Sequence, residues 1–183
     1  MDMRNFTAQT VLRLMLAAIL LCSVPFGLAA DDGDGNREHW TAVGSSGTAD
    51  EDSRGQVGFY QGVAFMGGYG TATLRYNVTA TDDLFGGNTT RFVMRYLDTG
   101  PCAKVEACLF RYNLNTGAND LLMTINSNSF PQSTSFQTRF IDSTTLPAFD
   151  FDNNAYYVEV YLTESCNNGV GNARIGILRL SRF

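Results

Sequence analysis

The feature that most constrains the fold is a two-residue alternation of apolar and polar side chains, which recurs along most of the chain. Residues 71–80 (TATLRYNVTA) and 156–163 (YYVEVYLT) show it most clearly. A period of two places each class of side chain on its own face of a β-strand. Beyond the first thirty residues, no window has apolar residues at helical spacing over three turns, so a parallel sheet would lack crossover helices. The sequence predicts an antiparallel, all-β protein.

The alternating segments are separated by turns rich in Gly, Pro, Asn and Asp. We expect about nine strands, at residues 39–44, 57–66, 71–80, 91–97, 104–112, 120–126, 134–141, 156–163 and 173–181. A sandwich and a barrel both fit this pattern. Clean alternation favours a two-sheet antiparallel sandwich, jelly-roll-like, because each sheet of a sandwich keeps one face in water.

The N-terminal segment 1–30 has the layout of a secretory signal peptide. Arg4 and Arg13 precede an apolar run at 14–21, and small residues end the segment at Ala30, where we expect cleavage. The run is shorter than the ~20 residues that span a bilayer, so we expect no stable membrane span after cleavage. A retained anchor is one alternative, and lipid attachment at Cys22 is another. A secreted, periplasmic or cell-surface location follows.

The remaining residues suffice for one domain. We expect an acidic, Gly-rich linker at 31–38 and a single β-sandwich domain at 39–183, with an exposed polar stretch at 45–55. After signal removal, 11 Lys and Arg stand against 17 Asp and Glu. This acidic balance gives no attraction to phosphate backbones, so nucleic acid is excluded as an expected partner.

Three cysteines remain after signal removal: Cys102, Cys108 and Cys166. Cys102 and Cys108 would lie about 20 Å apart along one strand, too far for a disulfide. Cys102 precedes one strand and Cys166 follows another, and antiparallel neighbours bring such positions together. We therefore predict a Cys102–Cys166 disulfide, with Cys108–Cys166 as the rival pairing and Cys108 otherwise a buried thiol.

Three stretches carry a resemblance to known proteins: residues 70–79 (GTATLRYNVT), 110–117 (FRYNLNTG) and 149–159 (FDFDNNAYYVE). Together they resemble secreted bacterial β-sandwich proteins of unassigned function, over most of residues 57–183. The resemblance implies the fold and a bacterial secreted origin. It implies no catalytic residue, because these motifs are strand and turn patterns.

The sequence carries no catalytic or cofactor signature. His39 is the only histidine, and no Gly-x-Ser-x-Gly turn is present, so we expect no catalytic residues and no cofactor. Asp150 and Asp152, followed by two asparagines, are weak calcium candidates, since carboxylate and amide oxygens suit a hard cation. The alternative is a turn whose side chains bond their own backbone.

Tyr157 and Tyr161 are the best ligand-binding candidates, because tyrosines two positions apart on the wet face of a strand would stack on sugar rings. The alternative is cross-strand packing. A set of arginines could add a patch for acidic sugar: Arg75, Arg95, Arg111, Arg139 and Arg179. The alternative is that they are solvated positions that pair with acidic neighbours or keep strand edges from aggregating.

Three functional classes stay open. The leading hypothesis is a secreted, non-catalytic module with a structural or adhesive role in the cell envelope or extracellular space, whose partner is an envelope protein or a glycan. A carbohydrate-binding module is the first alternative. A small secreted glycan hydrolase is the second, and it requires a cleft lined by two carboxylates.

Overall fold

The computed structural model describes residues 39–166 and 172–183. The predicted signal peptide (1–30) and linker (31–38) lie outside the described residues. Among the described residues, no helix is long and apolar enough to cross a membrane. The described residues form eleven strands: β1 Trp40–Val43, β2 Thr48–Ala49, β3 Val57–Tyr60, β4 Val63–Met66, β5 Gly70–Val78, β6 Thr90–Asp98, β7 Ala103–Asn113, β8 Asn119–Asn126, β9 Ser133–Ser143, β10 Asn154–Glu164 and β11 Arg174–Arg182.

In the part of the chain that the structure describes, four short helical segments connect the strands. One is an α-helical turn, and the others are 3-10 turns: α2 Asp82–Phe85, η1 Gly44–Ser46, η2 Glu51–Ser53 and η3 Ser127–Ser129.

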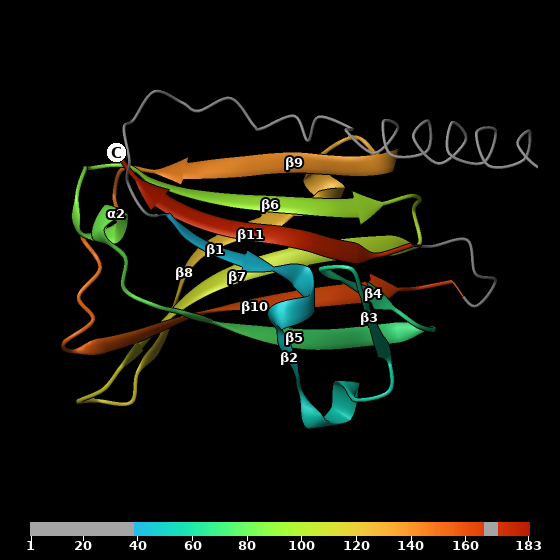
Figure 1. Cartoon of the computed structure of the whole chain (residues 1–183), viewed down its shortest axis with the longest axis horizontal. Coiled ribbons are helices and arrows are strands. Elements are labelled where there is room, and N and C mark those ends of the chain that lie inside the picture. The colour runs from blue at the N-terminus through green and yellow to red at the C-terminus, as the bar shows by residue number, and fades with distance from the viewer. Residues whose placement is uncertain (1–38, 167–171) are drawn as a thin grey trace, which may run out of the picture. The chain divides into compact units, whose positions relative to one another are not determined.

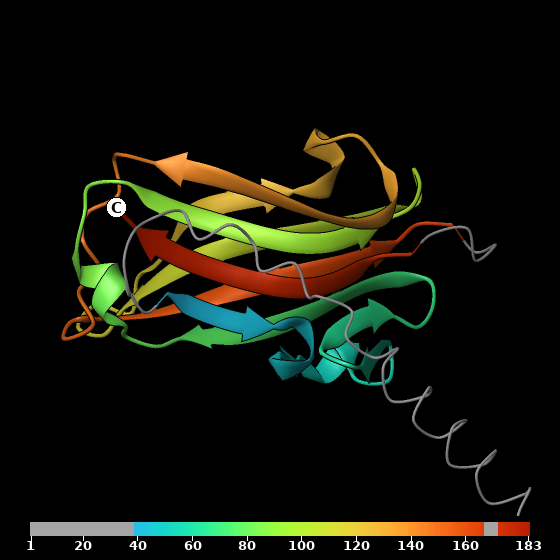
Figure 2. The ribbon, with the colours of Figure 1, turned by 45° about the horizontal axis from the view of Figure 1, so that its top comes forward.

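The strands form two antiparallel sheets packed face to face (Figures 1 and 2). The six-stranded sheet has the order β3-β4-β11-β6-β9, with β1 also paired to β11, and the five-stranded sheet has the order β2-β5-β10-β7-β8. Strands β4-β11-β6-β9 therefore face β5-β10-β7-β8, which is the strand order of a jelly roll. The predicted all-β, antiparallel, jelly-roll-like sandwich is confirmed.

The two-residue alternation determines which side chains fill the core. In β10 the even-numbered residues from Tyr156 to Leu162 are buried, and the odd-numbered residues from Tyr157 to Thr163 face outward. The six-stranded sheet contributes residues such as Phe92, Met94 and Leu178 to the same core. Apolar side chains of both sheets thus meet between the layers.

Two sequence expectations about the first third of the domain were wrong. Residues 57–66 form the β3–β4 hairpin instead of one strand, because Gln61 (φ 46°) and Gly62 (φ 83°) both adopt left-handed conformations that make a two-residue turn. The stretch 45–55 is not simply an exposed loop. It contains β2, which pairs with β5, and the buried Ser53, whose hydroxyl accepts a hydrogen bond from the Thr73 amide at 2.8 Å.

The predicted disulfide is confirmed. Cys102 precedes β7 and Cys166 follows β10, and these strands pair antiparallel with Ala103 opposite Glu164. The two Cα atoms lie 5.3 Å apart, and the Ser165 amide donates to the Cys102 carbonyl at 2.7 Å. Cys108 is free and buried, so the rival Cys108–Cys166 pairing does not form.

Candidate functional site

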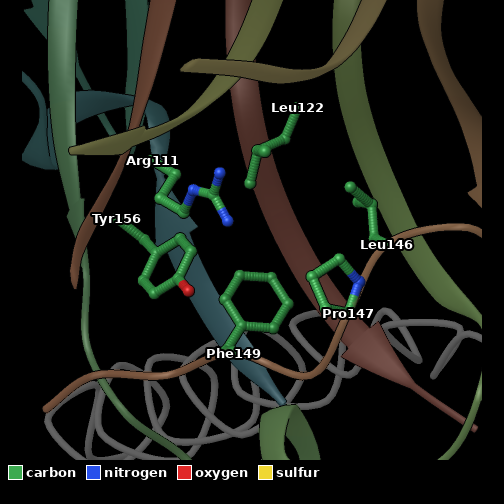
Figure 3. Close-up of a pocket in the computed structure, with 6 residues that line it drawn as sticks. All are labelled: Arg111, Leu122, Leu146, Pro147, Phe149 and Tyr156. Carbon is green, nitrogen blue, oxygen red and sulfur yellow. The ribbon is translucent and has the colours of Figure 1, made fainter. Parts of the chain in front are cut away.

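A small pocket opens at one end of the space between the sheets (Figure 3). Its walls are Arg111, Leu122, Leu146, Pro147, Phe149 and Tyr156. The cavity volume is about 10 Å³, which is room for roughly one water molecule. Arg111, whose guanidinium points toward this space in Figure 3, is paired with Asp120 at 2.7 Å. This pocket is too small to hold a sugar or a cofactor.

The outer face of the five-stranded sheet brings both predicted tyrosines together with polar partners. On the central strand β10, Tyr157 lies between Asn77 of β5 and Phe110 of β7, and Tyr161 lies between Thr73 and Glu106 of the same two strands. We call this surface the tyrosine face and define it by its outward side chains: Thr73, Arg75, Asn77, Glu106, Phe110, Asn119, Tyr157, Glu159 and Tyr161.

Tyr157 is held in place by contacts on both its ring and its hydroxyl. Its ring stacks on Phe110, with centroids 5.2 Å apart and planes inclined by 15°. Its hydroxyl accepts a hydrogen bond from the Asn119 side-chain amide at 2.7 Å. The ring is half-buried, so an apolar surface with a polar edge is presented in a fixed orientation.

Tyr161 belongs to a hydrogen-bonded chain that crosses the strands. Its hydroxyl donates to Glu159 at 2.5 Å, and the other carboxylate oxygen of Glu159 accepts from Arg75 at 2.7 Å. Arg75 also pairs with Asp50 at 2.8 Å. Burial, followed by the bond to Glu159, raises the pKa of Tyr161 above its ordinary value, so this hydroxyl stays protonated at neutral pH.

The remaining charges of the tyrosine face are also paired. Glu106 accepts from Lys104 at 3.0 Å. Between Glu106 and Glu159 lies Cys108, whose sulfur is 3.5 Å from the Thr124 hydroxyl. Burial raises the pKa of the Cys108 thiol, which disfavours the nucleophilic thiolate. The face therefore offers hydrogen-bonding groups and rings, and its two glutamates are both engaged by cations.

Asp150 and Asp152 lie in the exposed turn before β10. The Asp150 carboxylate accepts from the backbone amides of Asp152 and Asn153, both at 3.2 Å, and from the Asn153 side chain at 2.9 Å. These bonds, the one from the Asn153 side chain first, lower the pKa of Asp150. Among residues 39–166 and 172–183, no group of three acidic, His or Cys side chains could hold a metal. Calcium binding here stays a prediction.

His39 has a structural contact instead of a catalytic neighbour. Its Nδ1 lies 2.7 Å from Oδ2 of the buried Asp83, which also accepts from the Arg182 amide at 3.1 Å. Arg182 is itself buried and donates to the carbonyls of Pro147 and Gly87 at 2.6 and 3.0 Å. These groups tie α2 to the end of β11, so His39 anchors the entry into β1.

The predicted arginine patch does not form as one surface. Arg75 lies on the tyrosine face, whereas Arg95 and Arg179 lie on the outer side of the six-stranded sheet. Conversely, Phe110, Asn119 and the Arg75–Glu159 pair join Tyr157 and Tyr161 only through strand pairing. The alternation predicts that each of these residues lies on a solvent-exposed face of its strand. The strand register that brings them together cannot be read from a single sequence.

No protein-family model matches the chain, and no curated protein matches it. Solved structures of similar fold include a family two carbohydrate esterase from Cellvibrio japonicus (13% identity, TM-score 0.41, 81% of this chain and 35% of that one). A second is the CBM36-1 domain of a multidomain xylanase from the hindgut metagenome of Trinervitermes trinervoides (15% identity, TM-score 0.40, 80% of this chain and 98% of that one). A third is a Family 16 Carbohydrate Binding Module-2 (12% identity, TM-score 0.41, 76% of this chain and 87% of that one). The chain spans about a third of the length of the esterase. The likeness concerns the β-sandwich fold, and no sequence family is assigned.

Proposed function

We propose that the domain is a non-catalytic carbohydrate-binding module whose tyrosine face binds a neutral oligosaccharide. The observation that carries this proposal is the outward row of β10, where Tyr157 and Tyr161 flank Glu159 and Tyr157 lies beside Phe110. Rings separated by hydrogen-bonding groups match a sugar chain, which has apolar C–H faces and hydroxyl edges.

The charge pattern of the face favours an uncharged ligand. Arg75 is neutralised by Glu159 and Asp50, and Lys104 by Glu106. Paired ions of this kind still donate to and accept from hydroxyls, but they do not attract a ligand of either sign over a distance. Neutral glycans are therefore better partners for this face than acidic ones.

The side chains are also ordered before any ligand arrives. Tyr157 is stacked on Phe110 and bonded to Asn119, while Tyr161 is bonded to Glu159. Because these side chains are already fixed, binding would cost little side-chain entropy. Preorganised sites usually gain affinity in this way. The two tyrosines are four positions apart along the strand, a distance of about 13 Å. That distance exceeds one sugar ring, so we expect an oligosaccharide to be preferred over a monosaccharide.

The disulfide and the predicted signal peptide point to the same setting. A disulfide persists in oxidising compartments, where extracellular glycans are found. We therefore propose that the module lies outside the cytoplasm, secreted, periplasmic or at the cell surface, with a glycan as its partner.

The test is isothermal titration of the full-chain protein with neutral cello-, xylo-, manno- and galacto-oligosaccharides. We expect one class to bind, and Tyr157→Ala and Tyr161→Ala each to weaken it about tenfold. Tyr69→Ala is the matched control, because Tyr69 is 65% exposed and lies outside the tyrosine face. Thermal melting checks that each variant folds.

Two outcomes would contradict the proposal: no binding to any neutral glycan, or equal binding by both tyrosine variants and the wild type. Either would favour the structural or adhesive hypothesis and direct the search to protein partners. Repeating the titration with calcium and with Asp152→Ala tests the predicted calcium site in the same experiment.

A further inference from the structure

A larger cavity opens on the outer side of the six-stranded sheet. It lies where the β3–β4 hairpin, the start of β11 and the strand β9 come together, and its volume is about 270 Å³. We call it the arginine cavity. Its walls are Tyr60, Gln61, Val63, Phe65, Phe136 and Arg174.

Two glycines give the phenylalanine rings of the cavity their positions. A Cβ atom on Gly58 of β3 would lie 2.3 Å from Cζ of Phe65, and one on Gly176 of β11 would lie 3.3 Å from Cε1 of Phe136. Gly176 stands at the bulge between Ile175 and Ile177. Both rings thus rest against glycine backbone, in space that a side chain would fill.

Arg174 is oriented but not neutralised. Its Nε donates to the Asn172 side chain at 2.5 Å, and its guanidinium lies 5.7 Å from the Phe65 ring centroid. Arg95 lies over Phe136 at 5.5 Å and bonds Thr138. Within the described residues, no acidic side chain forms an ion pair with either arginine. The terminal nitrogens of Arg174 therefore remain available for a planar acceptor.

The surrounding face is basic although the chain carries a net charge of −5. Strand β6 directs both Arg91 and Arg95 outward on this face. Among the described strand residues of this face, Asp142 is the only acidic one, and it is paired with Arg91 at 2.8 Å. Arg95 and Arg174 thus give the cavity a positive charge that favours an anion, in contrast to the tyrosine face.

We propose that the arginine cavity binds the carboxylate of a uronic acid residue in an acidic glycan. A guanidinium with two free terminal nitrogens matches a carboxylate through two parallel hydrogen bonds. Phe65 and Phe136 contact the apolar face of the same sugar ring, and Arg95 lies close enough to attract the next acidic residue. The cavity is slightly smaller than the ~300 Å³ lower bound of drug-sized pockets, which suits one ring. This site is independent of the proposed neutral-glycan function.

The experiment titrates the full-chain protein with trigalacturonate and, as the matched ligand, with its uncharged methyl ester. We expect trigalacturonate to bind and the ester to bind at least about tenfold more weakly. Arg174→Gln, which keeps hydrogen-bond donors but removes the charge, should weaken trigalacturonate binding about tenfold. Arg75→Gln, on the opposite face, is the control and should leave it unchanged. Tyr157→Ala should also leave it unchanged, which separates this site from the tyrosine face.

The proposal is overturned if trigalacturonate does not bind, if the ester binds equally well, or if Arg174→Gln binds like the wild type. Tighter binding of a sulfated trisaccharide than of trigalacturonate would also overturn the carboxylate assignment. Loss of neutral-glycan binding in Tyr157→Ala with trigalacturonate binding intact would support two separate sites.

Discussion

The two outer faces of the sandwich contain similar residue types but use their arginines differently. On the tyrosine face, Arg75 pairs with Glu159 and Asp50. On the six-stranded sheet, Arg95 and Arg174 lie over phenylalanine rings and have no acidic partner among the described residues. The residue beside an arginine, and not the arginine itself, thus decides whether its charge is neutralised within the protein or stays available to a ligand.

Strand register explains the difference. Arg75 stands directly opposite Glu159 in the β5–β10 pair, whereas Arg95 stands opposite Thr138 and Arg174 opposite Phe65. Side chains directly opposite each other in antiparallel strands are close enough to pair. Arg75 therefore faces a carboxylate, whereas Arg95 and Arg174 do not. On the same sheet as these two, Arg91 does face a carboxylate, that of Asp142.

The largest predicted effect concerns the disulfide that links the start of β7 to the end of β10 in the five-stranded sheet. Replacing Cys102 and Cys166 by alanine should lower the free energy of unfolding by about 2–4 kcal/mol, because the unfolded chain loses a constraint over 64 residues. Chemical denaturation measures this loss, with Cys108→Ala as the control. Hydrogen exchange should accelerate more in β7 and β10 than in β6 and β9. Equal acceleration in both sheets would show that the link does not act locally.

The second prediction concerns Gly58→Ala, a variant that disrupts the arginine cavity and leaves the tyrosine face unchanged. In Gly58→Ala the new methyl group displaces the Phe65 ring, so trigalacturonate binding should fall about tenfold. The half-buried ring can swing outward, so the free energy of unfolding should fall by no more than about 1 kcal/mol. Gly68→Ala is the matched control, because a Cβ atom there meets nothing within 4 Å. Unchanged trigalacturonate binding in Gly58→Ala would contradict the assigned role of Phe65.

The third prediction is that ligand binding at the two faces depends differently on salt concentration. Raising NaCl from about 0.1 M to about 1 M shortens the Debye length from ~10 Å to ~3 Å. Trigalacturonate affinity should therefore drop several-fold, while the affinity for the neutral oligosaccharide should stay nearly constant. Titrations at both salt concentrations measure the contrast. A similar salt dependence for both ligands would refute the difference in charge between the two faces.

The smallest predicted effect tests the paired charges of the tyrosine face. Arg75→Gln breaks two ion pairs whose arginine is half-exposed, so the cost in unfolding free energy should be about 0.2–1 kcal/mol. Thermal and urea unfolding measure this cost, and Arg54→Gln at an exposed position is the control. A loss well above 1 kcal/mol would show that the pair stabilises the sheet more than exposed pairs usually do.

These contrasts mark what the sequence could and could not predict. The strand near residues 71–80 and the Cys102–Cys166 disulfide follow from local alternation and from antiparallel geometry. The β3–β4 turn was missed because Gln61 is not a residue that usually adopts a left-handed conformation. The arginine cavity was missed because β4, β9 and β11 come together only through long-range pairing. The role of Gly58 and Gly176, which leave room for the rings of Phe65 and Phe136, also depends on this long-range packing.

The pairing of β1 with β11 has a mechanical consequence. Trp40 stands opposite Leu180 and Val43 opposite Ile177, so the first and last of the described strands are antiparallel neighbours. Residues 39 and 183 lie at the same end of this strand pair, because the pair is antiparallel. Tension applied through them would therefore break the hydrogen-bonded pairs one after another, instead of shearing all of them at once. Under load, the domain should therefore yield first by peeling β1 away from β11, while the five-stranded sheet with its disulfide keeps its structure.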